Sequence, residues 1–199
     1  PYIGHPSQLC GVEEVRLIGG KGDGMRLFQV RNAAKLAFTV CADRCADIMR
    51  VSYMGENMSF FAPCGYVSPA YYDDRAEGFL KSFTAGFFTT CGLTNVGPAC
   101  VDEGELLPMH GTIGNIPAER IWWDETDETI DLHARVNDSC LDGRKLMLKR
   151  VISCQKYDSV IRVTDTVENQ GDRVSPFMLL YHLNVGYPLL TEQAQISVS

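Results

Sequence analysis

Two histidines stand in sequence contexts where an imidazole could carry out acid–base chemistry. His182 lies in the apolar run Leu-Leu-Tyr-His-Leu-Asn, two residues before Asn184. Strand side chains repeat every two residues, so these two are predicted to share one face and a common partner, such as a ligand with several hydroxyls. His110 lies next to Gly111 in a segment rich in glycine and proline. Because imidazole titrates near neutral pH, either ring could give up and recover a proton in each reaction cycle.

Structural roles for the same residue types remain open from the sequence. A histidine in an apolar run is more often a hydrogen-bonded core residue than a catalyst. Arg44 could reach a sugar hydroxyl or pair with Asp43 or Asp47, because a guanidinium suits both roles. Three carboxylates precede His110 and could either orient its ring or form a solvated acidic loop: Asp102, Glu103 and Glu105.

The composition is that of an acidic globular domain. A length of 199 residues suits one domain, and the formal net charge of -7 disfavours nucleic acid and anionic membranes as partners. The apolar runs are too short to cross a bilayer. The eight cysteines form no Cys-x-x-Cys pair and have no histidine pair nearby, so we expect no metal site. Four disulfides are one use of an even number, but a chain this long does not need them. We expect free thiols in a reducing cytoplasm.

Strand signals dominate the chain, with turn clusters such as residues 137–143 between them. The predicted strands are residues 25–31, 35–41, 46–53, 120–124, 129–136, 145–154, 160–168 and 176–185. Residues 70–81 are predicted to form one helix or helical turn, entered through Ser68 and Pro69. Residues 79–117 interrupt the strand pattern with glycine, threonine and proline, as loops that carry sites often do. The whole pattern predicts an all-β fold, an antiparallel sandwich or barrel.

Taken together, these segments resemble the aldose 1-epimerase-like proteins of the galactose mutarotase-like superfamily, and more narrowly the DUF4432 family. Each segment alone is weakly specific, whereas the set in this order runs through most of the chain. The segments are Asp43-Arg44 with Asp47-Ile48, Thr90-Cys91-Gly92-Leu93, Met109-His110-Gly111 with Asn115-Ile116-Pro117-Ala118, and Tyr181-His182-Leu183-Asn184 with Gly186-Tyr187-Pro188.

The resemblance implies a large antiparallel β-sandwich with a sugar cleft on one sheet. His110 would bind and polarise the sugar, and His182 would act as the general acid on the ring oxygen. Arg44, Thr90 and Asn184 would contact the substrate. The implied reaction interconverts sugar anomers by ring opening and needs no cofactor, so the implied partner is a small-molecule sugar.

One family feature is not found before Ser199. Aldose epimerases use a glutamate base well downstream of the second histidine, and Glu192 is too close to His182 to match it. We therefore expect residues 1–199 to form a single β-sandwich domain that lacks its C-terminal part, with the base beyond Ser199. A truncated sandwich would leave strand edges unpaired, which favours association with another chain, including formation of a homo-oligomer.

Two other functions remain open from the sequence. A non-catalytic carbohydrate-binding or sugar-sensing domain would keep the sandwich and the cleft but lack the base. A lyase or isomerase on the same fold would use a tyrosine base or a metal, and Tyr181 and Tyr187 lie near His182.

Overall fold

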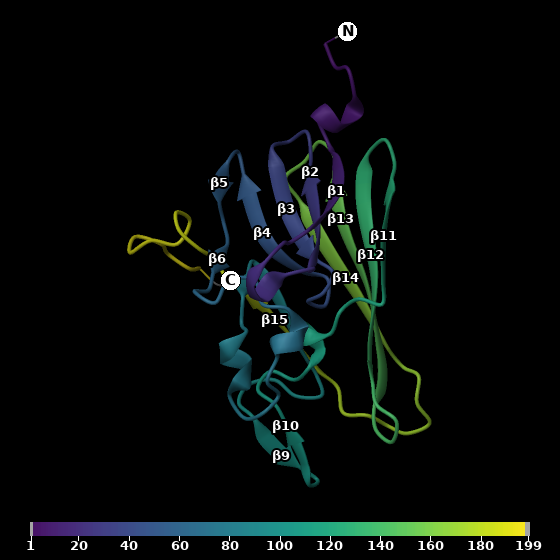
Figure 1. Cartoon of the computed structure of the whole chain (residues 1–199). Coiled ribbons are helices and arrows are strands. Elements are labelled where there is room, and N and C mark those ends of the chain that lie inside the picture. Colours follow the sequence, from purple (N-terminus) through teal and green to yellow (C-terminus); the bar gives the residue numbers. More distant parts are fainter. Residues whose placement is uncertain (1, 198–199) are drawn as a thin grey trace.

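Two antiparallel β-sheets face each other in this protein and form separate layers (Figure 1). The structure is a computed structural model and describes residues 2–197. The larger sheet has seven strands in the order β1-β2-β3-β4-β8-β15, and β5 also pairs with β4. These strands are β1 (Gly11–Arg16), β2 (Arg26–Arg31), β3 (Leu36–Cys41), β4 (Asp47–Tyr53), β5 (Glu56–Asn57), β8 (Phe88–Leu93) and β15 (Met178–Leu183).

The second sheet has four strands in sequence order and forms the green layer of Figure 1. Its strands are β11 (Arg120–Glu125), β12 (Thr129–Ser139), β13 (Lys145–Gln155) and β14 (Ile161–Asn169). Side chains on β12 alternate between buried and partly exposed, as a strand with one face on the core requires. The shared core lies between the two sheets, where Ile130, Leu132 and Leu148 pack with Phe28, Phe38 and Val40 of the larger sheet. The predicted all-β sandwich is therefore confirmed.

Short elements connect the sheets. Two small ribbons are formed by β6 (Phe60–Phe61) with β7 (Ala85–Gly86), and by β9 (Cys100–Asp102) with β10 (Glu105–Leu107). Five short 3-10 helices complete the described chain: η1 (Pro6–Gln8), η2 (Gly20–Gly22), η3 (Pro69–Tyr71), η4 (Gly78–Lys81) and η5 (Ile113–Asn115). Within residues 2–197, no helix has the length and apolar character needed to span a bilayer.

Two sequence predictions concern residues 70–117. Residues 70–81, predicted to form one helix or helical turn, form no continuous helix: the helical turns η3 and η4 flank an irregular stretch. The predicted entry is confirmed, because Ser68 caps η3 through a hydrogen bond from the Ala70 amide. The segment 79–117 was expected to be loop, but it contains β8, a central strand of the larger sheet. Every residue of β8 is buried, so it has no exposed face and shows no alternation in sequence.

A buried guanidinium joins the two sheets. Arg150 points inward from β13 and is 1 % exposed. Its Nη1 donates to Asp47 Oδ1 of β4 at 2.7 Å, and its Nη2 donates to Thr90 Oγ1 of β8 at 2.7 Å. Nε and Nη2 also form a bidentate pair with Asp165 of β14. Burial lowers the pKa of Arg150, but its hydrogen bonds to Asp165 and the nearby carboxylates outweigh this effect and raise the pKa above its ordinary value.

All eight cysteines are free thiols, as expected from the sequence. Burial raises the pKa of Cys41 and of Cys91 to about 12. A thiol with such a pKa is almost wholly protonated at neutral pH and is therefore unreactive. The exposed thiols are Cys100 and Cys140.

Candidate functional site

The structure brings His110 and His182 together. Their ring centroids are 5.9 Å apart and the rings are nearly perpendicular, with an interplanar angle of 87°. His182 reaches this position from β15, where it lies opposite Thr89 of β8. His110 reaches it from the turn that precedes η5, and the backbone of Gly111 in that turn forms a bridge to Gly92 at the far end of β8.

His110 is held by two hydrogen bonds to the backbone of Gly97. Its amide donates to the Gly97 carbonyl at 2.9 Å, and the Gly97 amide donates back to His110 Nδ1 at 3.2 Å. An Nδ1 that accepts a hydrogen bond carries no proton in the neutral ring, so the proton sits on Nε2, which is then a donor. Burial lowers the pKa of His110, and the neighbouring His182 lowers it further. The ring is therefore predominantly neutral at pH 7.

The turn at His110 requires glycine at its second position. His110 has φ of 59° and Gly111 has φ of 68°, both in the left-handed region. A Cβ on Gly111 would overlap the carbonyl oxygen of Gly92, so no larger residue fits against β8. The Gly111 carbonyl accepts a hydrogen bond from the Tyr72 hydroxyl at 3.3 Å, and burial raises the pKa of Tyr72 to about 12. Tyr72 therefore stays protonated as a donor.

The His182 ring lies in a partly apolar setting. Phe83 packs against it edge-on, with ring centroids 5.4 Å apart. Its Nδ1 is enclosed by protein and has no hydrogen-bond partner among the described residues. An enclosed polar atom without a partner costs about 1–3 kcal/mol, and such atoms call for an explanation such as a role in a site.

Two phenylalanines complete the site. Phe79 of η4 stacks on Phe83 with ring centroids 4.8 Å apart, and it also lies 5.2 Å from the ring of His110. The four rings form one cluster, so the segment that carries Phe79 and Phe83 sets the apolar side of the site. Neither phenylalanine was predicted from the sequence to belong to the site. Their signal was two aromatic residues in the irregular segment before His110, which alone does not indicate contact with either histidine.

Two of the three predicted substrate contacts are buried and otherwise engaged. Arg44 is 2 % exposed, its Nε donates to the Gly114 carbonyl, and its Nη1 donates to the carbonyls of Val67 and Ser82. It pairs with neither candidate carboxylate, since Asp43 pairs with Arg26 and Asp47 with Arg150.

Thr90 is also buried, and its hydroxyl donates to Asp47 Oδ1. Because backbone carbonyls and the Asp47 carboxylate account for these donors, we treat Arg44 and Thr90 as structural residues. Asn184 is partly exposed beyond the end of β15, and its amide donates to the His182 carbonyl at 3.1 Å.

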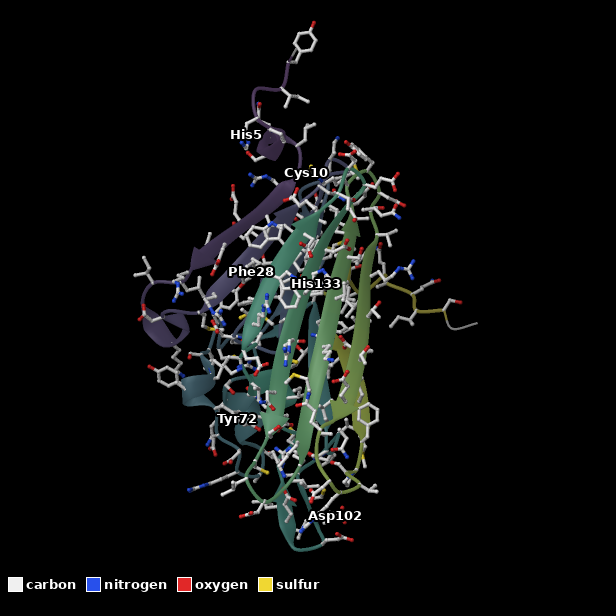
Figure 2. All side chains as sticks on the ribbon, turned by 90° about the vertical axis from the view of Figure 1, so that its right-hand side faces the viewer. His5, Cys10, Phe28, Tyr72, Asp102 and His133 are labelled. Atoms are coloured by element: carbon white, nitrogen blue, oxygen red, sulfur yellow. The ribbon has the colours of Figure 1, made fainter. Side chains whose placement is uncertain are left out.

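The acidic segment before His110 does not orient that ring. Asp102 lies on the β9–β10 ribbon, at the end of the molecule opposite His5 (Figure 2). Glu105, on the same ribbon, approaches Arg144 at 3.5 Å. Of the two alternatives that the sequence left open for these carboxylates, the structure supports the solvated acidic segment, since all three are exposed. Within residues 2–197, the histidine that does approach a carboxylate is His133, whose Nε2 lies 3.3 Å from Asp124 on the outer face of the second sheet.

One known protein family matches most of the chain. Residues 22–199 match the family described as Domain of unknown function (DUF4432). The chain belongs to this family. No curated protein shows significant sequence similarity to this DUF4432 chain.

Two solved structures share the fold of this DUF4432 protein. One is a "putative aldose 1-epimerase" from Klebsiella pneumoniae subsp. pneumoniae MGH 78578, with a TM-score of 0.83 and 22 % identity over 90 % of this chain and 48 % of that chain. The other is a galactose 1-epimerase from Lactobacillus acidophilus NCFM, with a TM-score of 0.58 and 16 % identity over 87 % of this chain and 52 % of that chain. The DUF4432 chain thus has the fold of carbohydrate epimerases and spans about half the length of these two structures.

The described residues offer no obvious place for a metal. No group of three or more His, Cys, Asp or Glu side chains within residues 2–197 is arranged to hold an ion. The two imidazoles can supply proton transfer and hydrogen bonding.

Proposed function

We propose that this DUF4432 protein interconverts the anomers of a free sugar, with His110 and His182 in its active site. The pairing of the two rings at 5.9 Å is the observation that carries the proposal. Support also comes from the fold, which is that of carbohydrate epimerases. The two histidines are 72 positions apart in sequence, so their meeting depends on the whole fold.

In the proposed reaction, the proton of the anomeric hydroxyl passes to a base while His182 protonates the ring oxygen. The bond between the anomeric carbon and the ring oxygen breaks, and an open-chain aldehyde forms. Rotation about the next carbon–carbon bond, followed by the reverse proton transfers, closes the ring on the opposite face. Each positioned proton transfer accelerates such a reaction by about 10²–10⁴.

The geometry suggests a different role for each histidine. His110 is held as a neutral ring with its proton on Nε2, so we propose that it donates a hydrogen bond to a sugar oxygen. Because Nδ1 of His182 is enclosed, its proton transfer would use Nε2. Phe79 and Phe83 would face the apolar carbon–hydrogen side of the sugar, as aromatic residues in sugar sites can. Asn184 would fix the backbone at the end of β15 through the hydrogen bond from its side-chain amide to the His182 carbonyl.

The proposed reaction needs a third group, a base, besides the two histidines. No carboxylate within residues 2–197 forms an ion pair with either histidine of the pair. We propose a glutamate base, as the family resemblance implies. Eight free thiols further support the proposal that the protein works in a reducing compartment such as the cytoplasm.

A mutarotation assay tests this proposal. Freshly dissolved α-glucose and α-galactose would be followed by polarimetry with wild type, His182→Ala and His110→Ala. His133→Ala is the matched control, because its ring stacks on Trp122 on the outer face of the second sheet. We expect acceleration by wild type and by His133→Ala, and none by the other two variants. Sugar binding without acceleration would instead favour a carbohydrate-binding domain, and equal rates for all four proteins would refute the assignment of the histidines.

A further inference from the structure

The turn that carries His110 is anchored from the opposite sheet. Two residues beyond His110, Thr112 Oγ1 lies 3.1 Å from Asp138 Oδ2, to which it donates, and it accepts a hydrogen bond from Arg144 Nη2 at 3.0 Å. Arg144 Nε donates to Asp138 Oδ1, also at 3.0 Å. These three side chains close a ring of hydrogen bonds, which we call the anchor triad.

Asp138 breaks the pattern of the strand on which it lies. The inward positions of β12 carry Ile130, Leu132, Ala134 and Val136, and Asp138 takes the next inward position with an exposure of 3 %. Burying an ion pair gains little stability over an apolar residue, because desolvation of the charges offsets their attraction. Stability alone therefore does not explain a carboxylate at this position.

The Asp138 carboxylate instead helps to fix the conformation of the turn that carries His110. His110 has a positive φ of 59°, a conformation that persists in a residue other than glycine only where the surroundings hold it. On one side Tyr72 holds the Gly111 carbonyl, and on the other side the anchor triad holds Thr112. The amide of Gly97 can meet Nδ1 of His110 only while the turn keeps this shape.

We propose that Asp138 and Arg144 are positioning residues for His110. Acting through Thr112, they hold the turn in the shape that keeps Nδ1 of His110 as an acceptor and Nε2 as a donor. The catalytic consequence rests on the proposed function, whereas the effect on the ring of His110 does not.

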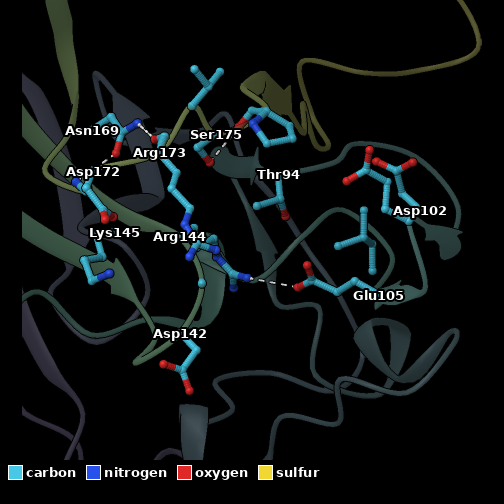
Figure 3. Close-up of a pocket in the computed structure, with 16 residues that line it drawn as sticks. Thr94, Asp102, Glu105, Asp142, Arg144, Lys145, Asn169, Asp172, Arg173 and Ser175 are labelled. Atoms are coloured by element: carbon cyan, nitrogen blue, oxygen red, sulfur yellow. Dashed lines mark hydrogen bonds and ion pairs between the residues drawn. The ribbon is translucent and has the colours of Figure 1, made fainter.

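The exposed side of Arg144 supplies a matched control. Arg144 lines a pocket of about 270 Å³ between the β9–β10 ribbon and the β14–β15 connection, where its Nη1 approaches Glu105 at 3.5 Å (Figure 3). The Glu105 side chain is 66 % exposed, so water and salt screen this pair. Glu105→Gln removes a carboxylate from the same guanidinium and leaves the anchor triad intact.

The test uses nitrogen NMR of protein labelled in its histidines. The signals of His110 are assigned by comparison with His110→Gln. In wild type and Glu105→Gln, Nδ1 should show the shift of an unprotonated nitrogen. In Thr112→Val, which keeps the shape but removes the hydroxyl, we expect a mixture of the two tautomers and a titration midpoint closer to that of a solvated histidine. Thr112→Ser should restore both values.

Kinetics provide a separate readout of the same variants. We expect Thr112→Val to lower kcat for mutarotation by about ten- to a hundredfold, the size of effect caused by a small misplacement of a reacting group, with little change in KM. If wild type does not accelerate mutarotation, the proposed function fails, and the NMR measurement still decides the positioning role. Asp138→Asn is the second variant if Thr112→Val does not fold. Unchanged tautomer and titration of His110 in a folded variant would overturn the inference.

Discussion

Replacing Arg150 by methionine should be among the most destabilising single substitutions in the molecule. The change removes the cation between the sheets and leaves Asp47 and Asp165, whose side chains are 1 % and 2 % exposed, without it. Removing one partner of a buried ion pair typically costs about 3–5 kcal/mol, because an uncompensated charge remains inside.

The loss of unfolding free energy in Arg150→Met should be larger at neutral pH than at acidic pH. A buried carboxylate that loses its cation can escape the penalty by binding a proton, so its pKa in the folded variant rises above the unfolded value near 3.9. Holding one carboxyl protonated costs about 1.4 kcal/mol per pH unit above that value, which is about 4 kcal/mol at pH 7 and about 1.5 kcal/mol at pH 5. The loss of stability should therefore be large at pH 7 and should shrink as the pH falls to 5.

Urea unfolding followed by circular dichroism at the two pH values measures this loss. Lys149→Met is the matched control, since Lys149 is the residue before Arg150 on β13, on the opposite face, with a partly exposed ion pair to Glu168. That pair should contribute at most about 1 kcal/mol. If Arg150→Met lost less than about 1 kcal/mol at pH 7, or lost the same amount at both pH values, this account of the buried cation would be incorrect.

Two further predictions concern the site. The pKa of His110 should lie below that of a solvated histidine, so activity that needs its neutral ring should fall only at a pH more acidic than the midpoint of a solvated histidine. In His182→Gln the NMR titration midpoint of His110 should rise only part of the way to that of a solvated histidine, because burial is the larger cause of the lowered pKa. Gly111→Ala should lower the urea midpoint much more than Gly104→Ala, because a Cβ at Gly104 meets nothing within 4 Å and carries only the strain of positive φ, about 1 kcal/mol. Equal losses in these two glycine variants would contradict the proposed overlap with Gly92.

The strands with one buried face were predictable from sequence. The predicted segment 129–136 corresponds to the alternating apolar part of β12, and the strand itself extends three polar residues further to Ser139. The missed strand β8 reads Phe-Thr-Thr-Cys-Gly-Leu, with polar residues that are buried because neighbouring segments bond to them. The pattern of apolar residues in a sequence predicts which side chains are buried because they are hydrophobic. It does not predict polar residues that are buried because the fold supplies their hydrogen-bond partners.

The site was predictable only in part for the same reason. The sequence contexts of His110 and His182 indicated both as candidate site residues, and the structure places their rings side by side. The roles of Arg44 and Thr90 depend on partners far along the chain. The cation that binds Thr90 is Arg150, 60 residues away in sequence. Spacing along the chain contains no information about such contacts.

The distribution of thiols has a practical consequence. Cys100 and Cys140 are exposed, whereas Cys41, Cys45, Cys91 and Cys154 are buried, with pKa values that burial raises. A thiol-reactive dye should label the two surface positions quickly in the native protein, the half-buried Cys10 and Cys64 more slowly, and the buried four only in molecules that have opened. The rate at which the last four thiols are labelled therefore measures how often the interior opens under native conditions, without any denaturant.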